Sequence, residues 1–183
     1  MGTGHFLTRS VALRKQIDAP IFSRKIDALT RHPEATMYRN ILVPTDGSRL
    51  SLKAAAHAID LAKAIGARLT GFHASPDLPL PVYADGVVFE PLSRKEYAAQ
   101  CKKEADRILN AVAVKAQAAG IAFDSVSAIS SSPWEAILDA AKKQKCDAIV
   151  MASHGRRGVA ALVLGSETQK VLTHSKLPVL VVR

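Results

Sequence analysis

The chain has 183 residues, of which 48% are hydrophobic, and this favours one domain with a packed core; no apolar run is long enough to span a membrane. The formal net charge is +9, but the basic residues are dispersed and are not interleaved with aromatic residues, which argues against a nucleic-acid-binding surface. Cys101 and Cys146 are too few for a disulfide framework or a metal cluster and fit a reducing compartment, so we expect a cytoplasmic protein.

Residues 1–37 form a basic segment that differs from the rest of the chain. No apolar core of signal-peptide length follows its first basic residues, so secretion is not indicated. Its apolar residues have loosely helical spacing, which allows a short amphipathic helix. We expect an N-terminal extension, flexible or briefly helical, and one domain over residues 38–183. Met37 stands directly before the first predicted strand and could be the start of the protein in the cell.

The chain then alternates between strand-like and helix-like segments. Ile41–Pro44 predicts a strand, Asp46-Gly47-Ser48 turns into a helix that ends at Gly66, and residues 68–74 predict a second strand. Residues 75–92 are rich in proline and predict a long loop. The predicted apolar face of the first helix consists of Leu52, Ala55, Ala56, Ile59, Ala62 and Ile65.

The second half continues the alternation. Ser93 and Glu96 form a capping box that predicts a helix ending at Gly120, and Ser132-Pro133 predicts the start of another, with the serine as its cap. The remaining predicted elements are strands at 122–129, 148–152 and 179–182 and a helix at 166–173. Strands alternating with helices indicate an α/β fold, a single doubly wound domain with a parallel sheet covered on both faces.

The strongest indication of function is a loop between the last two strands. Met151-Ala152-Ser153-His154-Gly155-Arg156-Arg157-Gly158 follows a buried strand, and Gly165-Ser166-Glu167-Thr168-Gln169 opens a helix. Ser166 and Gln169 have the form of a capping box. A glycine-bearing loop that leads to a helix N-terminus presents backbone N–H groups, which suit an anionic group such as phosphate.

This loop resembles the nucleotide loop of the universal stress protein family, written G-x-x-G-x9-G-[ST]. Gly155, nine intervening residues and Gly165-Ser166 carry the match, whereas Ala152 stands where the ATP-binding branch usually has its first glycine. The Cβ of Ala152 matters if the backbone there needs positive φ or close contact with the nucleotide. The resemblance extends over Asn40–Ser48 and Lys176–Val182, and in layout from Tyr38 to Arg183.

The resemblance implies a Rossmann-like, five-stranded parallel sheet in the order 3-2-1-4-5, consistent with right-handed crossovers. It also implies ATP as the ligand, with magnesium, and a homodimer through the C-terminal strand Val179–Val182. That strand is apolar and predicted to lie at a sheet edge, where exposed backbone groups invite pairing with a second copy. Covering of this edge by the N-terminal extension is the alternative.

In open parallel sheets the ligand binds beyond the carboxyl ends of the strands, where the winding direction switches. The switch would lie between strands one and four of the predicted sheet. Pro44-Thr45-Asp46 ends the first and Ala152-Ser153-His154-Gly155 the fourth, so the topology and the loop indicate the same crevice. The candidate nucleotide-binding residues are Pro44, Thr45, Asp46, Ala74, Ala152, Ser153, His154, Gly155, Arg156, Arg157, Gly158, Gly165, Ser166 and Glu167.

Two of these residues have competing interpretations. Asp46 could bind a ribose hydroxyl or a magnesium ion held with the nucleotide, or it could cap the following helix. His154 could titrate near neutral pH, but no acidic residue lies nearby in sequence to orient it, so a backbone-bonded loop histidine is preferred and no catalytic residue is predicted.

We therefore expect a dimeric, ATP-binding regulator of the stress response with an unidentified protein partner. The sequence lacks a P-loop, a G-x-G-x-x-G dinucleotide motif and a G-x-S-x-G elbow, so machinery for rapid phosphoryl transfer is not visible. Two alternatives stay open: an interaction module that has lost nucleotide binding, which Ala152 would explain, and a slow ATP-hydrolysing or self-phosphorylating enzyme.

Overall fold

A computed structural model describes residues 37–78, 82–84, 87–89, 92–155 and 164–183. All of them belong to the second of the two compact units of the chain, residues 36–183. Apart from Met37, the predicted N-terminal extension lies outside the described residues, and so do Arg156, Arg157 and Gly158 of the predicted loop.

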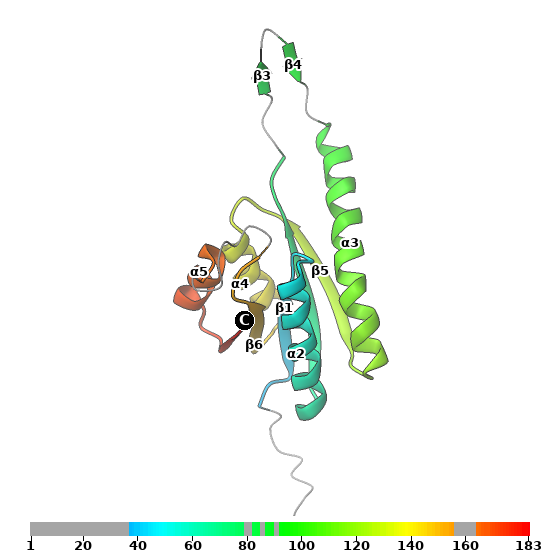
Figure 1. Ribbon diagram of the computed structural model, residues 1–183, viewed down its shortest axis with the longest axis vertical. Helices are drawn as coiled ribbons and strands as arrows, with labels where there is room; N and C mark the ends of the chain where they lie inside the picture. Colours follow the sequence, from blue (N-terminus) through cyan, green and yellow to red (C-terminus); the bar gives the residue numbers. More distant parts are fainter. Residues whose placement is uncertain (1–36, 79–81, 85–86, 90–91, 156–163) are drawn as a thin grey trace, which may run out of the picture. The chain divides into compact units, whose positions relative to one another are not determined.

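The core of this unit is a five-stranded parallel sheet (Figure 1). Its strands lie in the order β5-β2-β1-β6-β7, which is 3-2-1-4-5 when they are numbered along the chain, and the predicted order is confirmed. The strands are β1 (Asn40–Pro44), β2 (Arg68–Ser75), β5 (Phe123–Ile129), β6 (Ala148–Ala152) and β7 (Val179–Val182).

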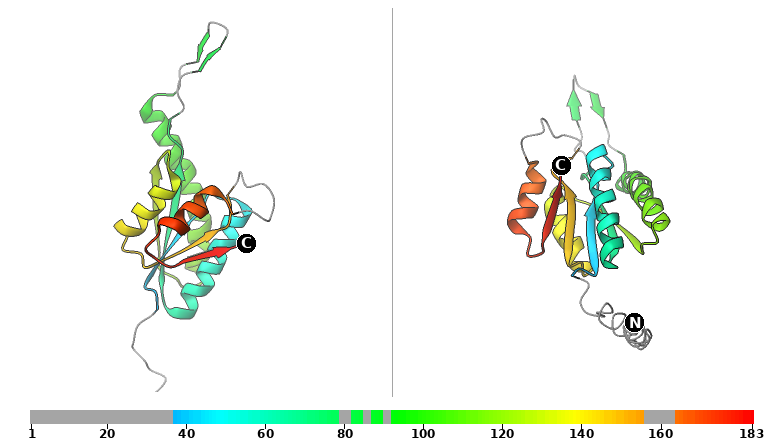
Figure 2. Two further views of the ribbon diagram at one scale, coloured as in Figure 1. Left: turned by 90° about the vertical axis from the view of Figure 1, so that its left-hand side faces the viewer. Right: turned by 60° about the horizontal axis from the view of Figure 1, so that its bottom comes forward.

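Helices cover both faces of the sheet (Figure 2). They are α2 (Arg49–Ile65), α3 (Arg94–Ala118), α4 (Pro133–Lys143) and α5 (Ser166–His174). Successive side chains of a strand point to opposite faces, and β1 shows the result. Ile41 and Val43 pack into the apolar core under α2 and α3, whereas Leu42 packs into the second core under α4 and α5.

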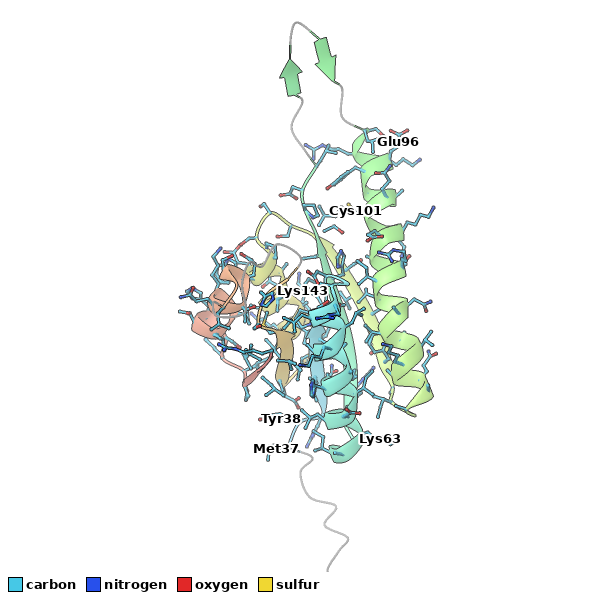
Figure 3. All side chains as sticks on the ribbon, viewed as in Figure 1. Met37, Tyr38, Lys63, Glu96, Cys101 and Lys143 are labelled. Carbon is cyan, nitrogen blue, oxygen red and sulfur yellow. The ribbon has the colours of Figure 1, made fainter. Side chains whose placement is uncertain are left out.

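Most helix ends follow the local signals of the sequence. The Ser48 hydroxyl caps α2 by accepting a hydrogen bond from the Ser51 N–H, and Gly66 ends the helix in the left-handed conformation with φ of 72°. At α3 the capping box of Ser93 and Glu96 makes both of its hydrogen bonds, and Glu96, labelled in Figure 3, lies in the first turn of this helix. These predictions are confirmed.

The predicted long loop at residues 75–92 contains two short strands, which is a correction. β3 (Val82–Ala84) and β4 (Val87–Phe89) pair antiparallel, with Ala84 opposite Val87. Their valines and aromatic residues favour strands, and the intervening sequence Asp-Gly is the pair typical of two-residue hairpin connections. The prolines of the segment favoured the prediction of a loop over that of a hairpin.

The buried face of α2 also differs from the predicted one. Ala56 is exposed, and Ala54 and Ala58 are fully buried in its place. The helix is rich in alanine, and alanines on all sides weaken the hydrophobic periodicity that indicates which face of a helix is buried.

Candidate functional site

The two strand ends that were predicted to form the crevice are neighbours in the sheet. β1 pairs with β6 through Ile41 opposite Ala148 and Leu42 opposite Ile149, and with β2 on its other side. The chain therefore winds from β1 in one direction to β2 and β5, and in the other direction to β6 and β7 (Figure 1). The carboxyl ends of β1 and β6 border the topological switch point, where ligands of such sheets bind.

The turn after β1 is held by its own side chains. The Thr45 N–H donates to the carbonyl oxygen of Phe72 at 2.8 Å, and the buried Thr45 hydroxyl is 2.9 Å from the Ser51 hydroxyl and accepts from the Gly47 N–H at 3.2 Å. Gly47 has φ of 77°, in the left-handed region that glycine adopts without strain. Thr45 thus holds the turn through its side chain.

Asp46 connects this turn to the loop after β6. Its Oδ1 accepts a hydrogen bond from the Ser48 N–H at 2.9 Å, which closes an Asx turn before α2, while Ser48 itself caps the helix. Its Oδ2 lies so close to Gly155 that a Cβ placed on this glycine would be 2.6 Å away from it. A side chain at position 155 would therefore displace the Asp46 carboxylate, and the structure brings these two predicted site residues together.

The two ends of the 154–164 loop lie against each other. The Gly165 N–H donates to the carbonyl oxygen of Ser153 at 2.8 Å, and the Ser153 N–H donates to that of Val182 at 2.8 Å. A Cβ on Gly165 would be 3.2 Å from the His154 Cα. The buried Thr168 hydroxyl donates to the carbonyl oxygen of Ala152 at 3.0 Å, which fixes the first turn of α5 to the end of β6.

The start of α5 corrects the predicted capping box. The helix begins at Ser166, so Gly165 occupies the N-cap position and offers no side-chain acceptor. Gln169 donates through its backbone N–H to the carbonyl oxygen of Gly165, as an ordinary helical residue does. The motif Ser-x-x-Gln lies one residue too far along the chain to cap. A helix start with no capping side chain at its N-cap suits an anionic ligand.

Ala152 is accommodated without strain. Among the described residues other than glycine, only Lys145 has positive φ, so the backbone at Ala152 does not require glycine. The Ala152 side chain is buried and belongs to the apolar cluster that includes Ala55 and Ala58 of α2. The Cβ that distinguishes this chain from the usual loop motif thus packs within the protein core.

Glu167 has a structural partner that the sequence did not predict. Its Oε2 accepts a hydrogen bond from the backbone N–H of Trp134 at 2.9 Å, and its Oε1 accepts one from Lys170 at 3.2 Å. The predicted cap of α4, Ser132, makes no side-chain capping bond. Glu167 therefore supplies the acceptor at this helix N-terminus from another helix.

Two histidines lie near the crevice. The Nδ1 of the buried His73 is 2.8 Å from the carbonyl oxygen of Thr45, and since a carbonyl only accepts, this nitrogen carries a proton. Sequence reasoning assigned no role to this side chain. The Nδ1 of His154 is 3.1 Å from the Ser153 hydroxyl, a side-chain partner where a backbone partner was predicted.

Pro44 is buried and Ala74 is partly buried, at the ends of β1 and β2.

The described residues contain no cluster of three or more histidine, cysteine or acidic side chains that could hold a metal ion. Across the same part of the chain, no helix combines the length and apolar character needed to cross a membrane. Fold and site together define a doubly wound α/β protein with a candidate ligand crevice at its switch point.

Comparison with known proteins places the chain within one family. Residues 37–183 match the model of the universal stress protein family, and the chain belongs to that family. It is 31% identical over 161 residues to universal stress protein MJ0531 of Methanocaldococcus jannaschii, covering 86% of this chain and 89% of that protein. It is 37% identical over 150 residues to a universal stress protein of Thermus aquaticus, covering 80% of this chain and 100% of the relative.

Solved structures share the fold. Universal stress protein UspA from Lactobacillus plantarum superposes with a TM-score of 0.63 at 24% identity, over 80% of this chain and 98% of that one. The crystal structure of a universal stress protein in complex with cAMP superposes with a TM-score of 0.57 at 26% identity, over 80% of this chain and 97% of that one.

Proposed function

We propose that this protein binds an adenine nucleotide, with ATP and magnesium as the expected ligand, in the crevice between the ends of β1 and β6. It acts as a homodimeric regulator of the stress response. The observation that carries the proposal is the contact between Asp46 and Gly155 at the switch point, beside a loop whose two ends are tied together by the Gly165–Ser153 hydrogen bond.

The chemistry of these residues fits a nucleotide. The two ends of the loop are joined by a hydrogen bond beside a helix N-terminus without a capping side chain, an arrangement that favours phosphate groups. The Asp46 carboxylate suits a ribose hydroxyl, or a magnesium ion held jointly with phosphate oxygens. The relative crystallised with cAMP supports an adenine nucleotide as the ligand class. Ala152 poses no obstacle, because its side chain packs into the core.

The edge strand β7 supports the homodimer. Within the described sheet β7 pairs with β6 alone, and its Leu180 is 48% exposed. An apolar edge strand with unpaired backbone groups is satisfied when two copies pair about a twofold axis. The proposed role is regulation through binding.

The test is calorimetry of the full chain with ATP, with and without magnesium, after mass spectrometry of the protein purified without added nucleotide. Asp46→Asn keeps an acceptor for the Ser48 N–H but removes the charge, so it should weaken binding of ATP more in the presence of magnesium than in its absence. Asp60→Asn, on the exposed side of α2, is the matched control and should bind as the parent does. Absence of binding at millimolar ATP would refute the proposal.

A further inference from the structure

The second edge of the sheet, β5, presents a row of backbone groups to solvent. Within the described sheet β5 pairs only with β2. The carbonyl oxygen of Ala122 accepts a hydrogen bond from the Leu69 N–H of β2, and the Ser130 N–H donates to the carbonyl oxygen of Ser75. The even-numbered residues from 122 to 130 therefore direct their N–H and C=O groups toward β2. Because successive residues alternate, Ser125, Ser127 and Ile129 direct their N–H and C=O groups outward, and all three are exposed.

A groove lies beside this edge on the α4 face of the sheet. It has a volume of about 320 Å³, and Phe72, Val126 and Ala128 contribute apolar surface to it. Glu135 and Asp139 of α4 line it as well, and they lie on one side of the helix because they are four residues apart. The groove therefore combines an apolar surface with an acidic wall.

The two carboxylates of this wall are available to a partner. Glu135 and Asp139 are exposed, and neither forms an ion pair or a side-chain hydrogen bond with any described residue. Lys143, labelled in Figure 3, lies one helical turn beyond Asp139 and lines the same groove, so the acidic wall consists of Glu135 and Asp139 alone. In a chain with a net charge of +9, two neighbouring unpaired carboxylates over apolar surface form a local site for a cation with an apolar stem.

The opposite face of the same edge is hollowed too. A groove of about 490 Å³ lies between α3 and β5 and is lined by polar side chains that include Lys103, Asn110 and Ser125. In Figure 1, β5 lies between β2 and α3. A strand added to β5 would place its successive side chains alternately in the two grooves. Each groove would thus contact every second side chain of an added strand.

We propose that β5 binds an extended segment of a partner protein, which adds to the sheet as a further strand. Its lysine or arginine side chains, at alternate positions, lie over Val126 and Ala128 and bring their charges to Glu135 and Asp139. Backbone hydrogen bonds to Ser125, Ser127 and Ile129 supply affinity, and the acidic wall supplies specificity. This surface is separate from the proposed nucleotide crevice and from the β7 edge.

A second copy of the chain fits this edge less well than a basic segment does. Two copies that pair edge to edge about a twofold axis form an antiparallel continuous sheet in which the same faces lie side by side. Both acidic walls would then lie on one face of the joined sheet, and the like charges of Glu135 and Asp139 in the two copies would repel. Charge complementarity therefore favours a basic partner.

The experiment measures binding of a defined peptide to the full chain by fluorescence anisotropy. The probe has the length of β5, seven residues, with lysine and threonine alternating. One control peptide has the same composition with the lysines in a block, and another has glutamate in place of lysine. We expect the alternating lysine peptide to bind more tightly than both controls. Equal binding of the alternating and block peptides would show general charge attraction and overturn the proposal.

Ser127→Pro tests the backbone pairing. Proline removes an N–H that points outward and occupies the space of the added strand, and edge strands tolerate proline at such positions. We expect Kd for the alternating peptide to rise by about tenfold or more, whereas Ser127→Thr, which keeps the N–H, should bind as the parent does. Undiminished binding by a folded Ser127→Pro protein would overturn strand addition. So would conversion of a dimer to a monomer by this substitution, since a second copy would then occupy the edge.

Charge reversal gives an independent test that does not alter the strand. With Glu135→Lys and Asp139→Lys together, the preference should change from the lysine to the glutamate peptide, while Asp60→Lys on α2 should leave it unchanged. In the parent protein, added peptide should slow amide hydrogen exchange at Ser127 and Ile129, whose N–H groups face outward. A preference for lysine that survives the double reversal, or unchanged exchange at these amides with the peptide bound, would overturn the proposal.

Discussion

The carboxylate of Glu167 in α5 accepts a hydrogen bond from the backbone N–H of Trp134 in α4, at 2.9 Å. The Trp134 and His174 rings, 4.7 Å apart between centroids, join the same two helices. Glu167 belongs to the helix that also carries the end of the candidate nucleotide loop. One side chain therefore couples the helix beside the crevice to the helix beside the β5 groove.

Replacing Glu167 should destabilise the protein. Glu167→Ala removes the acceptor at the N-terminus of α4, and the loss of a helix cap costs about 1 kcal/mol of unfolding free energy. Urea unfolding followed by circular dichroism measures the change. Lys170→Ala is the matched control: it removes only the exposed ion pair of Glu167, whose contribution is at most about 0.5 kcal/mol. Equal effects of the two substitutions would mean that the hydrogen bond to Trp134 does not contribute.

Because Asp46 and Gly155 are in contact, we expect the effects of substituting them on the free energy of unfolding to be coupled. Gly155→Ala places a Cβ 2.6 Å from Oδ2 of Asp46, so the carboxylate must move. We expect a loss of about 0.5–1.5 kcal/mol in unfolding free energy, because Gly155 is exposed and the displaced carboxylate gives up its hydrogen bond from the Ser48 N–H. In an Asp46→Ala background the added methyl group has room, and its cost should fall. A double-mutant cycle from denaturant unfolding measures this coupling, and additivity of the two substitutions would contradict the contact.

The two cysteines should differ in reactivity. Burial raises the pKa of the Cys146 thiol above its ordinary value, and the nearby Asp147 carboxylate acts in the same direction. Less thiolate is then present at a given pH, and the buried sulfur is also inaccessible. We expect one fast-reacting thiol, Cys101, in the folded protein, and a second only after denaturation. Titration with a chromogenic disulfide reagent measures both, and Cys101→Ser should abolish the fast phase.

The proposed dimer makes a prediction for the other edge of the sheet. Leu180→Glu puts a charge on the apolar edge strand β7, where Leu180 is 48% exposed, and should convert the dimer to a monomer. Sedimentation velocity measures the mass. Leu172→Glu is the control, because Leu172 is similarly exposed at 41% but lies on α5. A dimer that persists in the Leu180 variant would move the interface elsewhere.

The layout of the fold follows from local signals in the sequence. Short apolar strands, amphipathic helices, the capping box of Ser93 and the terminal Gly66 each act within a few residues, so the alternation could be predicted. The order of the sheet was predicted from the family resemblance and from right-handed crossovers. The cap of α4 could not be predicted, because its acceptor Glu167 lies 33 residues further along the chain. The start of α5 at Ser166 was predicted, but its cap was misassigned: Ser166 has a capping sequence, yet it is the first helical residue and Gly165, whose N–H bonds to Ser153, occupies the N-cap.

The site shows the same limit. The sequence predicted which strand ends would border the crevice, because topology alone decides it. It could not predict that Asp46 lies against Gly155, or that the Ala152 side chain packs toward α2, since both depend on side-chain directions in the folded protein. The outward row of β5 was also missed, because the register of β5 with β2, which decides which residues direct their backbone groups outward, was not predicted.

The central position of β1 has a consequence for the growing chain. β1 pairs with β2 on one side and with β6 on the other, and the Arg39 and Asn40 N–H groups bond to Asp147, more than a hundred residues away. During synthesis, β1, β2 and β5 can assemble with α2 and α3 while one edge of β1 stays bare until β6 leaves the ribosome. For that interval a strand that is buried at every residue in the finished protein presents an open sheet edge, to which another chain can pair.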